Sequence, residues 1–261
     1  MTIQKKETFV QVVDKRLRVQ QFYQESGENK PTIVFLHEGL GSIELWKDFP
    51  QMVMQATGLN ILLYERQGHG QSEALNTPRP LNYLEVEALE YLPVLLEQLG
   101  IQEPILLGHS DGGTIALLYA AQYPVKLLIT AAAHVLVEDI TVKGIQDVVA
   151  YYQQGKMLPK LMAYHGEKAA ALFAAWADTW LHPEFRNWNV AACLSDINCP
   201  ALLLQGKEDE YATDEHLNLI VDGIGANARG LLIDGCGHSP HIQAKEFFLE
   251  QTVAFIQEQL R

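Results

Sequence analysis

Six short and almost uninterrupted apolar runs constrain the fold of this chain more than any other feature of its sequence. Runs that are apolar on both faces are typical of strands in a parallel sheet, because helices cover such a sheet on both sides. Segments with helical periodicity lie between the runs, and this alternation indicates a doubly wound sheet with right-handed crossovers. The predicted strands occupy residues 32–36, 60–64, 104–107, 125–130, 201–204 and 230–233, and the predicted helices occupy residues 82–99, 114–122, 213–224 and 243–260.

Two parts of the chain depart from this alternation. Period-2 patterns over residues 8–13 and 17–23 predict an opening antiparallel pair of strands. From about residue 137 to 196 no convincing strand pattern occurs, whereas the Ala-rich stretch 168–176 favours helix. We therefore predict a core domain made of residues 1–136 and 197–261, with a helical cap inserted at residues 137–196.

The composition argues against several classes of protein. A net charge of −13 argues against long-range attraction to nucleic acid or to an anionic membrane. No run approaches the roughly 18 apolar residues of a membrane-spanning helix, and no apolar segment of a signal peptide follows Lys5 and Lys6. The three cysteines, Cys193, Cys199 and Cys236, favour reduced thiols over a disulfide framework. We expect a cytoplasmic protein whose partner is a small-molecule substrate, with neither a nucleic acid nor a membrane as partner; its oligomeric state is left open.

The third predicted strand ends at the pentapeptide Gly-His-Ser-Asp-Gly, residues 108–112, and a helical pattern follows at once. Strand, sharp turn and helix in this order are the setting of a nucleophile elbow, which exposes a serine above the sheet. Gly108 and Gly112 lack the Cβ atoms that would clash as the chain reverses around Ser110. The helix that follows offers backbone N–H groups to a developing negative charge. The pentapeptide therefore predicts Ser110 as a nucleophile, with an ordinary glycine turn as the alternative.

A serine hydroxyl is a weak nucleophile and needs a base, which in turn needs a group that fixes its tautomer. His238 follows a predicted strand in a Gly-rich loop and is the favoured base, whereas His241 lies beyond Pro240, where a helix is expected. The strand at residues 201–204 leads into three carboxylates, at positions 208–210, which the residues alone leave nearly equivalent. The histidines could instead bind a metal, but no further ligands with suitable spacing are evident.

Four motifs in order give the chain a resemblance to the α/β-hydrolase superfamily over nearly its whole length. One is the elbow at Ser110, and another pairs Gly206-x-x-Asp209 with Gly237-His238. The other two are the loop 36–42 (Leu-His-Glu-Gly-Leu-Gly-Ser), similar to the family's His-Gly oxyanion loop, and the stretch 64–72 (Tyr-Glu-Arg-Gln-Gly-His-Gly-Gln-Ser), similar to its Asp-Arg-x-Gly-x-Gly-x-Ser segment. The resemblance implies an α/β-hydrolase fold with a mostly parallel, twisted, eight-stranded sheet, helices on both faces and a helical cap.

The resemblance also implies a role for each matching residue. Ser110 would be the nucleophile, His238 the general base and then the acid, and Asp209 the orienting carboxylate, because the family places its acid three residues after the glycine. The oxyanion hole would consist of the backbone N–H groups of Asp111 and Gly39. Leu40, Trp176 and Trp180 are candidate substrate contacts.

Two positions beside these residues remain open. The family usually has glycine directly after the loop histidine, whereas this chain has Glu38, which would weaken anion stabilisation if it pointed inward or form a salt bridge if it did not. The side chain of Asp111 could contact the substrate or cap the following helix, and capping is favoured. Arg66 and His69 are interpreted as structural members of a tight loop.

No dinucleotide fingerprint or phosphate-binding loop is complete in the sequence, so no cofactor and no metal are expected. The leading hypothesis is a serine hydrolase (a serine esterase) that cleaves small carboxylic esters through an acyl-enzyme. A C–C bond hydrolase of the ring-fission or β-diketone type, which uses the same triad, is one alternative. A ligand-sensing protein on a hydrolase fold is the other.

Overall fold

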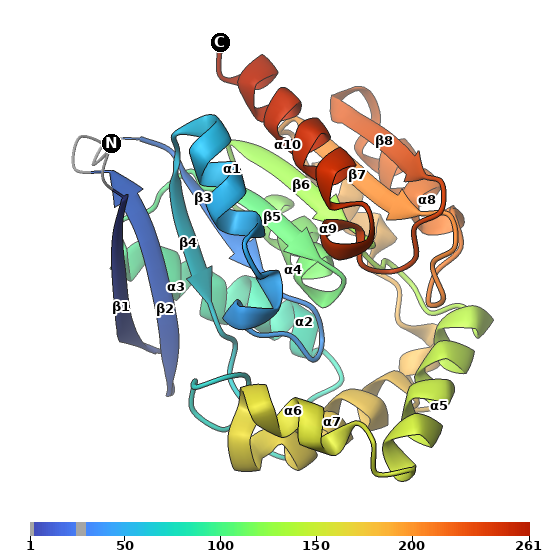
Figure 1. Cartoon of the computed structure of the whole chain (residues 1–261). Coiled ribbons are helices and arrows are strands. Elements are labelled where there is room, and N and C mark those ends of the chain that lie inside the picture. The colour runs from blue at the N-terminus through green and yellow to red at the C-terminus, as the bar shows by residue number, and fades with distance from the viewer. Residues whose placement is uncertain (1–2, 25–29) are drawn as a thin grey trace.

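The computed structural model describes residues 3–24 and 30–261. Its centre is an eight-stranded sheet in the order β1-β2-β4-β3-β5-β6-β7-β8 (Figure 1). β2 pairs antiparallel with both β1 and β4, and every pair from β4 through β8 is parallel. The predicted mostly parallel eight-stranded sheet is therefore confirmed. The strands are Ile3–Val12, Lys15–Gln24, Thr32–Leu36, Asn60–Tyr64, Ile105–His109, Leu127–Ala131, Ala201–Gly206 and Ala228–Ile233.

The strands of the sheet are apolar on both faces because each face is covered by its own apolar layer. In β3, Val34 and Leu36 belong to one layer, and Ile33 and Phe35 belong to the other. All residues of β5 are buried. Burial on both sides explains why these strands are continuous apolar runs in the sequence instead of alternating patterns.

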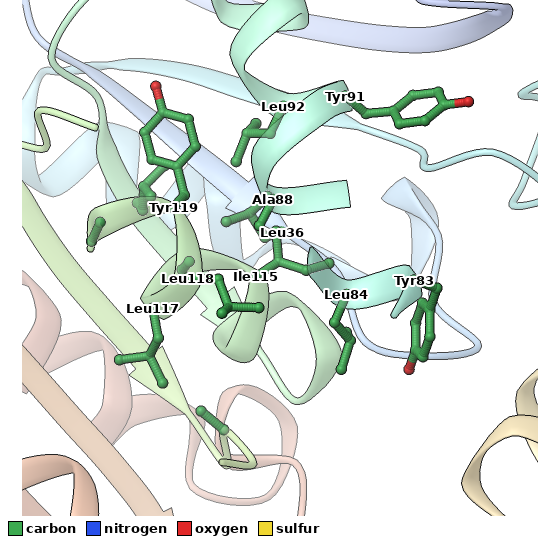
Figure 2. Close-up of a cluster of buried hydrophobic side chains, with 14 of the residues drawn as sticks. Leu36, Tyr83, Leu84, Ala88, Tyr91, Leu92, Ile115, Leu117, Leu118 and Tyr119 are labelled. Atoms are coloured by element: carbon green, nitrogen blue, oxygen red, sulfur yellow. The ribbon is translucent and has the colours of Figure 1, made fainter. Parts of the chain in front are cut away.

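Helices form the outer layers on both sides of the sheet. α1 (Phe49–Thr57) and α10 (Lys245–Gln259) lie together on one face, where the rings of Phe49 and Phe248 have centroids 5.1 Å apart. α3 (Leu92–Gln98), α4 (Asp111–Ala120) and α8 (Glu215–Ile224) contribute to the other face. Figure 2 shows how apolar side chains fill the space between α4 and the helical segment before β5; among them are Leu84, Ala88, Leu92, Ile115 and Leu118.

Three helices between β6 and β7 lie together at one end of the sheet, in the yellow-green to gold part of Figure 1. They are α5 (Asp139–Gln153), α6 (Leu158–His165) and α7 (Ala169–Trp180). Tyr152 of α5 stacks on Phe173 of α7 with ring centroids 3.8 Å apart, which ties the two helices together. Residues 137–196 are thus helical as expected, whereas their separation as a cap domain stays a prediction.

Several element boundaries differ from the sequence-based expectation. α1 was not predicted; it is short, contains Pro50 in its first turn and has no side-chain hydrogen bond at its N-cap. α4 begins at Asp111, directly after Ser110, and not at residue 114. The predicted helix at 82–99 is divided into α2 (Tyr83–Val86), a π-helical turn (Glu87–Tyr91) and α3. No helix in the described ranges is long and apolar enough to cross a bilayer.

Candidate active site

The elbow between β5 and α4 holds Ser110 in a strained backbone conformation, with φ 53° and ψ −120°. Such a conformation is uncommon for a residue with a side chain and occurs in tight functional turns. A Cβ at Gly112 would lie 1.9 Å from the carbonyl oxygen of Leu36, and one at Gly108 would lie 2.2 Å from that of Gly112. The two glycines are therefore required by close backbone approach, which is the physical reason for the Gly-x-Ser-x-Gly pattern.

Ser110, His238 and Asp209 form a continuous hydrogen-bonded chain. The Ser110 Oγ lies 2.9 Å from Nε2 of His238, and Nδ1 of His238 lies 2.9 and 3.0 Å from the two carboxylate oxygens of Asp209. Because a carboxylate only accepts, Nδ1 carries the proton and the lone pair of Nε2 faces the serine hydroxyl. Burial raises the pKa of Asp209, but the hydrogen bond and charge of His238 outweigh it, so the pKa is lowered overall. The arrangement can take a proton from Ser110.

The three carboxylates at positions 208–210, which follow β7, all accept hydrogen bonds from the segment that carries His238. Glu208 accepts a hydrogen bond from the backbone N–H of Cys236 at 2.9 Å, and Glu210 accepts one from the N–H of His238 at 3.2 Å. Only Asp209 reaches the imidazole. The sequence could not separate these residues, because all three serve the same loop and differ only in which atom they contact.

The loop that contains Gly39 and Leu40 is fixed through its carbonyl groups. Nη2 of Arg66 donates to the carbonyl of Glu38 at 2.8 Å, and Nε2 of His69 lies 3.0 Å from that of Gly39. His165 of α6 lies 3.1 Å from the carbonyl of Leu40. Within the described ranges, the N–H groups of Gly39 and Asp111 donate no hydrogen bond to the protein. Both remain available as donors, as an oxyanion hole requires.

The side chain of Asp111 does not cap α4, so the favoured interpretation of this residue was wrong. Its Oδ2 accepts hydrogen bonds from the Tyr83 hydroxyl at 2.8 Å and from both terminal nitrogens of Arg66 at 3.3 and 3.4 Å. A buried carboxylate next to a buried guanidinium gains more from this charged pair than from a single backbone N–H. Arg66 therefore neutralises Asp111 beside Ser110, in keeping with the structural role predicted for Arg66.

A cavity of about 150 Å³ opens beside Ser110 and His238. The predicted contacts Leu40, Trp176 and Trp180 all line it. Several further lining residues, for which no pattern in the sequence is a signal, come from α5, the α5–α6 loop and the strand ends: His134, Thr141, Ile145, Val148, Met157 and Tyr211. Their contribution depends on which face each cap helix turns toward the core, which composition does not reveal.

An outer groove of about 600 Å³ shares Glu38, Leu40, Val148, Met157 and Tyr211 with this cavity. Two cap aromatics, Tyr151 and Tyr164, line the groove. Other cap aromatics pack on one another instead: Tyr152 on Phe173, and Phe185 on Trp188. The cap aromatics are thus divided between the two cavities and the packing of the helices.

A methyl group at Gly39 should impair catalysis without unfolding the protein. Its Cβ would lie 2.6 Å from Nε1 of Trp176, so the loop and its N–H must shift. We expect Gly39→Ala to lower kcat/KM about 10- to 100-fold. Complete removal of one oxyanion-hole donor typically lowers kcat by about 10²–10³-fold, and a displaced donor should cost somewhat less. Gly100→Ala is the control: its Cβ meets no atom within 4 Å, but its φ of +69° strains any side chain. It should lower the melting temperature and leave kcat/KM intact. An unchanged kcat/KM in Gly39→Ala would remove Gly39 from the oxyanion hole.

The chain belongs to the alpha/beta hydrolase family, whose model matches residues 33–251. It is 28% identical to the serine hydrolase BPHL of Homo sapiens over 253 residues, which cover 92% of this chain and 84% of that protein. It is 25% identical to a proline iminopeptidase of Lactobacillus delbrueckii subsp. bulgaricus, with 85% of this chain and 88% of that protein covered.

Solved structures show the same fold. The 2-hydroxy-6-oxo-6-phenylhexa-2,4-dienoate hydrolase of Rhodococcus sp. strain RHA1 superimposes with a TM-score of 0.82 over 98% of this chain and 100% of that chain, at 12% sequence identity. The predicted α/β-hydrolase fold is confirmed, and a hydrolase is the class of enzyme that the family and its members define.

Proposed function

We propose that this hydrolase cleaves small carboxylic esters through an acyl-enzyme formed on Ser110. The observation that carries the proposal is the hydrogen-bonded chain from Ser110 through His238 to Asp209, which ends beside an apolar cavity. A positioned base and an orienting carboxylate are what a serine needs in order to attack an acyl carbon.

The proposed reaction proceeds in two halves. His238 takes the proton of Ser110 as its oxygen attacks the carbonyl carbon, and the N–H groups of Gly39 and Asp111 stabilise the oxyanion. His238 then returns the proton to the leaving alcohol, and the acyl group remains on Ser110. A water molecule, deprotonated by His238, attacks the acyl-enzyme, and His238 then returns this proton to the Ser110 oxygen as the bond to the acyl group breaks and the carboxylic acid leaves. Asp209 holds the Nδ1–H tautomer and stabilises the imidazolium without becoming protonated itself.

The size of the inner cavity supports a small substrate. Its volume of about 150 Å³ lies below the roughly 300–1,000 Å³ of pockets that hold drug-sized ligands. Asp111 on its wall is paired with Arg66, and most of the lining is apolar, so an uncharged group fits best. The larger outer groove leaves room for the remainder of a longer substrate.

Cleavage of a C–C bond is the second candidate, because the same triad serves ring-fission hydrolases. The two reactions can be separated with one panel of substrates: short and long p-nitrophenyl esters, prolyl p-nitroanilide and a vinylogous 1,5-diketone. We expect rapid turnover of the short esters. Faster turnover of the diketone would move the assignment to a C–C hydrolase, and faster turnover of the anilide would move it to a peptidase. Tight ligand binding without any turnover would favour a sensing role.

The cavity wall should set the preferred acyl length. Ile145 of α5 is 3% exposed and lines the inner cavity, so Ile145→Ala enlarges the space beside Ser110. We expect wild-type kcat/KM to fall about tenfold from p-nitrophenyl butyrate to octanoate, and the variant to lose most of this discrimination. A tenfold change corresponds to the rejection of about one methylene by the inner cavity, at roughly 1–3 kcal/mol per methylene, while the outer groove takes the rest of the longer chain. Val149→Ala, on the same helix but lining neither cavity, is the matched control. An unchanged chain-length profile in Ile145→Ala would place the acyl chain elsewhere.

A further inference from the structure

Glu38 lies in the oxyanion loop, at the position where the sequence departs from the family pattern, and its carboxylate faces His109. Its Oε2 is 3.6 Å from Nδ1 of His109, the residue that immediately precedes Ser110. The His109 side chain is 2% exposed and that of Glu38 is 24% exposed. The pair therefore joins the two segments that carry Gly39 and Ser110.

The other nitrogen of His109 contacts the loop of the catalytic base. Nε2 of His109 lies 2.7 Å from the carbonyl oxygen of His238. A carbonyl oxygen only accepts, so Nε2 must carry a proton and donate. Nδ1 is then the nitrogen that faces the carboxylate: a lone pair there would be repelled by Glu38, whereas a second proton would be attracted. The geometry therefore favours an imidazolium at His109, paired with a carboxylate at Glu38.

The surroundings are consistent with this charge assignment. Burial raises the pKa of Glu38, but the contact with His109 and the neighbouring rings of His37 and His241 hold it at about 2, so the residue is a carboxylate at neutral pH. The His109 ring has centroid distances of 4.8 Å to His241 and 5.2 Å to His238, and Trp46 lies at 6.4 Å. Burial, followed by the charge of His109, lowers the pKa of His241 to about 3, which leaves that ring neutral.

We propose that Glu38 and the buried His109 form an ion pair that couples the oxyanion loop to the loop of His238, so that both act as positioning residues for the attack by Ser110. The inference rests on the function proposed above. One end of the pair fixes the backbone next to Gly39, and the other fixes the backbone of His238 itself. This coupling gives a physical role to Glu38, which stands where the family usually has glycine.

The test is a double-mutant cycle with Glu38→Gln, His109→Gln and the two combined, assayed with p-nitrophenyl butyrate. We expect each single substitution to lower kcat about tenfold with KM within about twofold, and the double variant to be no worse than the poorer single one, because coupled residues are not additive. Glu38→Asp should recover part of the lost kcat.

Glu44→Gln is the matched control. Glu44 pairs with Arg18, 2.6 Å away on β2, and the substitution should leave kcat within twofold. The coupling would be overturned by additive losses in the double variant, by a loss expressed in KM instead of kcat, or by lower melting temperatures with normal kcat.

Labelling of Ser110 by phenylmethanesulfonyl fluoride separates this inference from the proposed function. If the wild type is labelled and turns over esters, and the Glu38 and His109 variants do both equally well, only the ion-pair coupling is rejected. A wild type that neither turns over esters nor reacts with the reagent rejects the function itself.

Discussion

Replacement of Ser110 by alanine is expected to lower kcat for p-nitrophenyl esters by about 10⁴-fold or more. The substitution removes the only atom that can form the acyl bond in the proposed reaction, while His238, Asp209 and the oxyanion donors stay in place. What remains is the modest acceleration that binding and the oxyanion hole supply to a water attack. The Ser110→Ala protein should also fail to accumulate an acyl adduct, which intact-mass spectrometry after rapid mixing with substrate detects directly.

The fold should tolerate this change, so that the loss of activity is chemical. Alanine meets the same backbone requirement as serine at φ 53°, and the hydroxyl contributes one hydrogen bond, to His238. Ser195→Ala, at an exposed position remote from the cavity, is the matched control and should retain wild-type kcat. Turnover by Ser110→Ala within tenfold of wild type would show that another group carries the reaction.

The sequence predicts the parts of the site that depend on the course of the backbone. The two glycines around Ser110 are required by backbone clearances of about 2 Å, at Gly108 against Gly112 within the elbow and at Gly112 against Leu36 of β3, so they leave a clear pattern in the sequence. The strands can also be recognised in the sequence. A strand that is buried on both faces, such as β5, appears as an almost continuous run of apolar residues.

The side-chain contacts of the site depend on the fold instead, which is where the predictions fell short. Asp111 was expected to cap a helix, which is a local rule, but its partners Arg66 and Tyr83 lie 45 and 28 positions away in the chain. In the same way, the choice of Asp209 among three acids needs the position of a loop 29 residues further on. Packing on the core decides which faces of α5 and α7 line the cavity, and no residue spacing in the sequence reveals these faces.

The protein is also expected to lose stability steeply between pH 7 and pH 5. Six buried or half-buried histidines have a pKa below the ordinary value of 6.5, chiefly because of burial: His37, His69, His134, His165, His216 and His241. The pKa is about 3 for His37, His134 and His241 and about 4 for His216. The folded state keeps these rings neutral, whereas the unfolded chain takes up protons below pH 6.5.

The sign follows from this difference in bound protons. Stability from a base with a lowered pKa is complete above pH 6.5 and is lost as the pH falls, by about 1.4 kcal/mol per pH unit for each ring. Glu65 and Glu87 act in the opposite direction, because burial raises their pKa to about 7 and about 6, so protonation stabilises the folded state. Carboxylates with a lowered pKa, such as Asp209, lose their contribution only below pH 4.5, outside this window.

Counted on the four histidines whose pKa is about 3 or 4, the rings outweigh the two raised carboxylates by about 4 kcal/mol, and at least this much of the free energy of unfolding should disappear between pH 7 and pH 5. For a chain of this size such a loss lowers the melting temperature by about 10 °C, which thermal unfolding followed by circular dichroism measures. His241→Phe should flatten the dependence, because its ring packs against Trp46 and Phe49 and phenylalanine takes up no proton. His182→Gln, at an exposed position, should leave the slope unchanged. A melting temperature that stays constant to pH 5 would mean that the buried rings are already protonated in the folded protein, and it would contradict the neutral tautomers on which the geometry of the oxyanion loop depends.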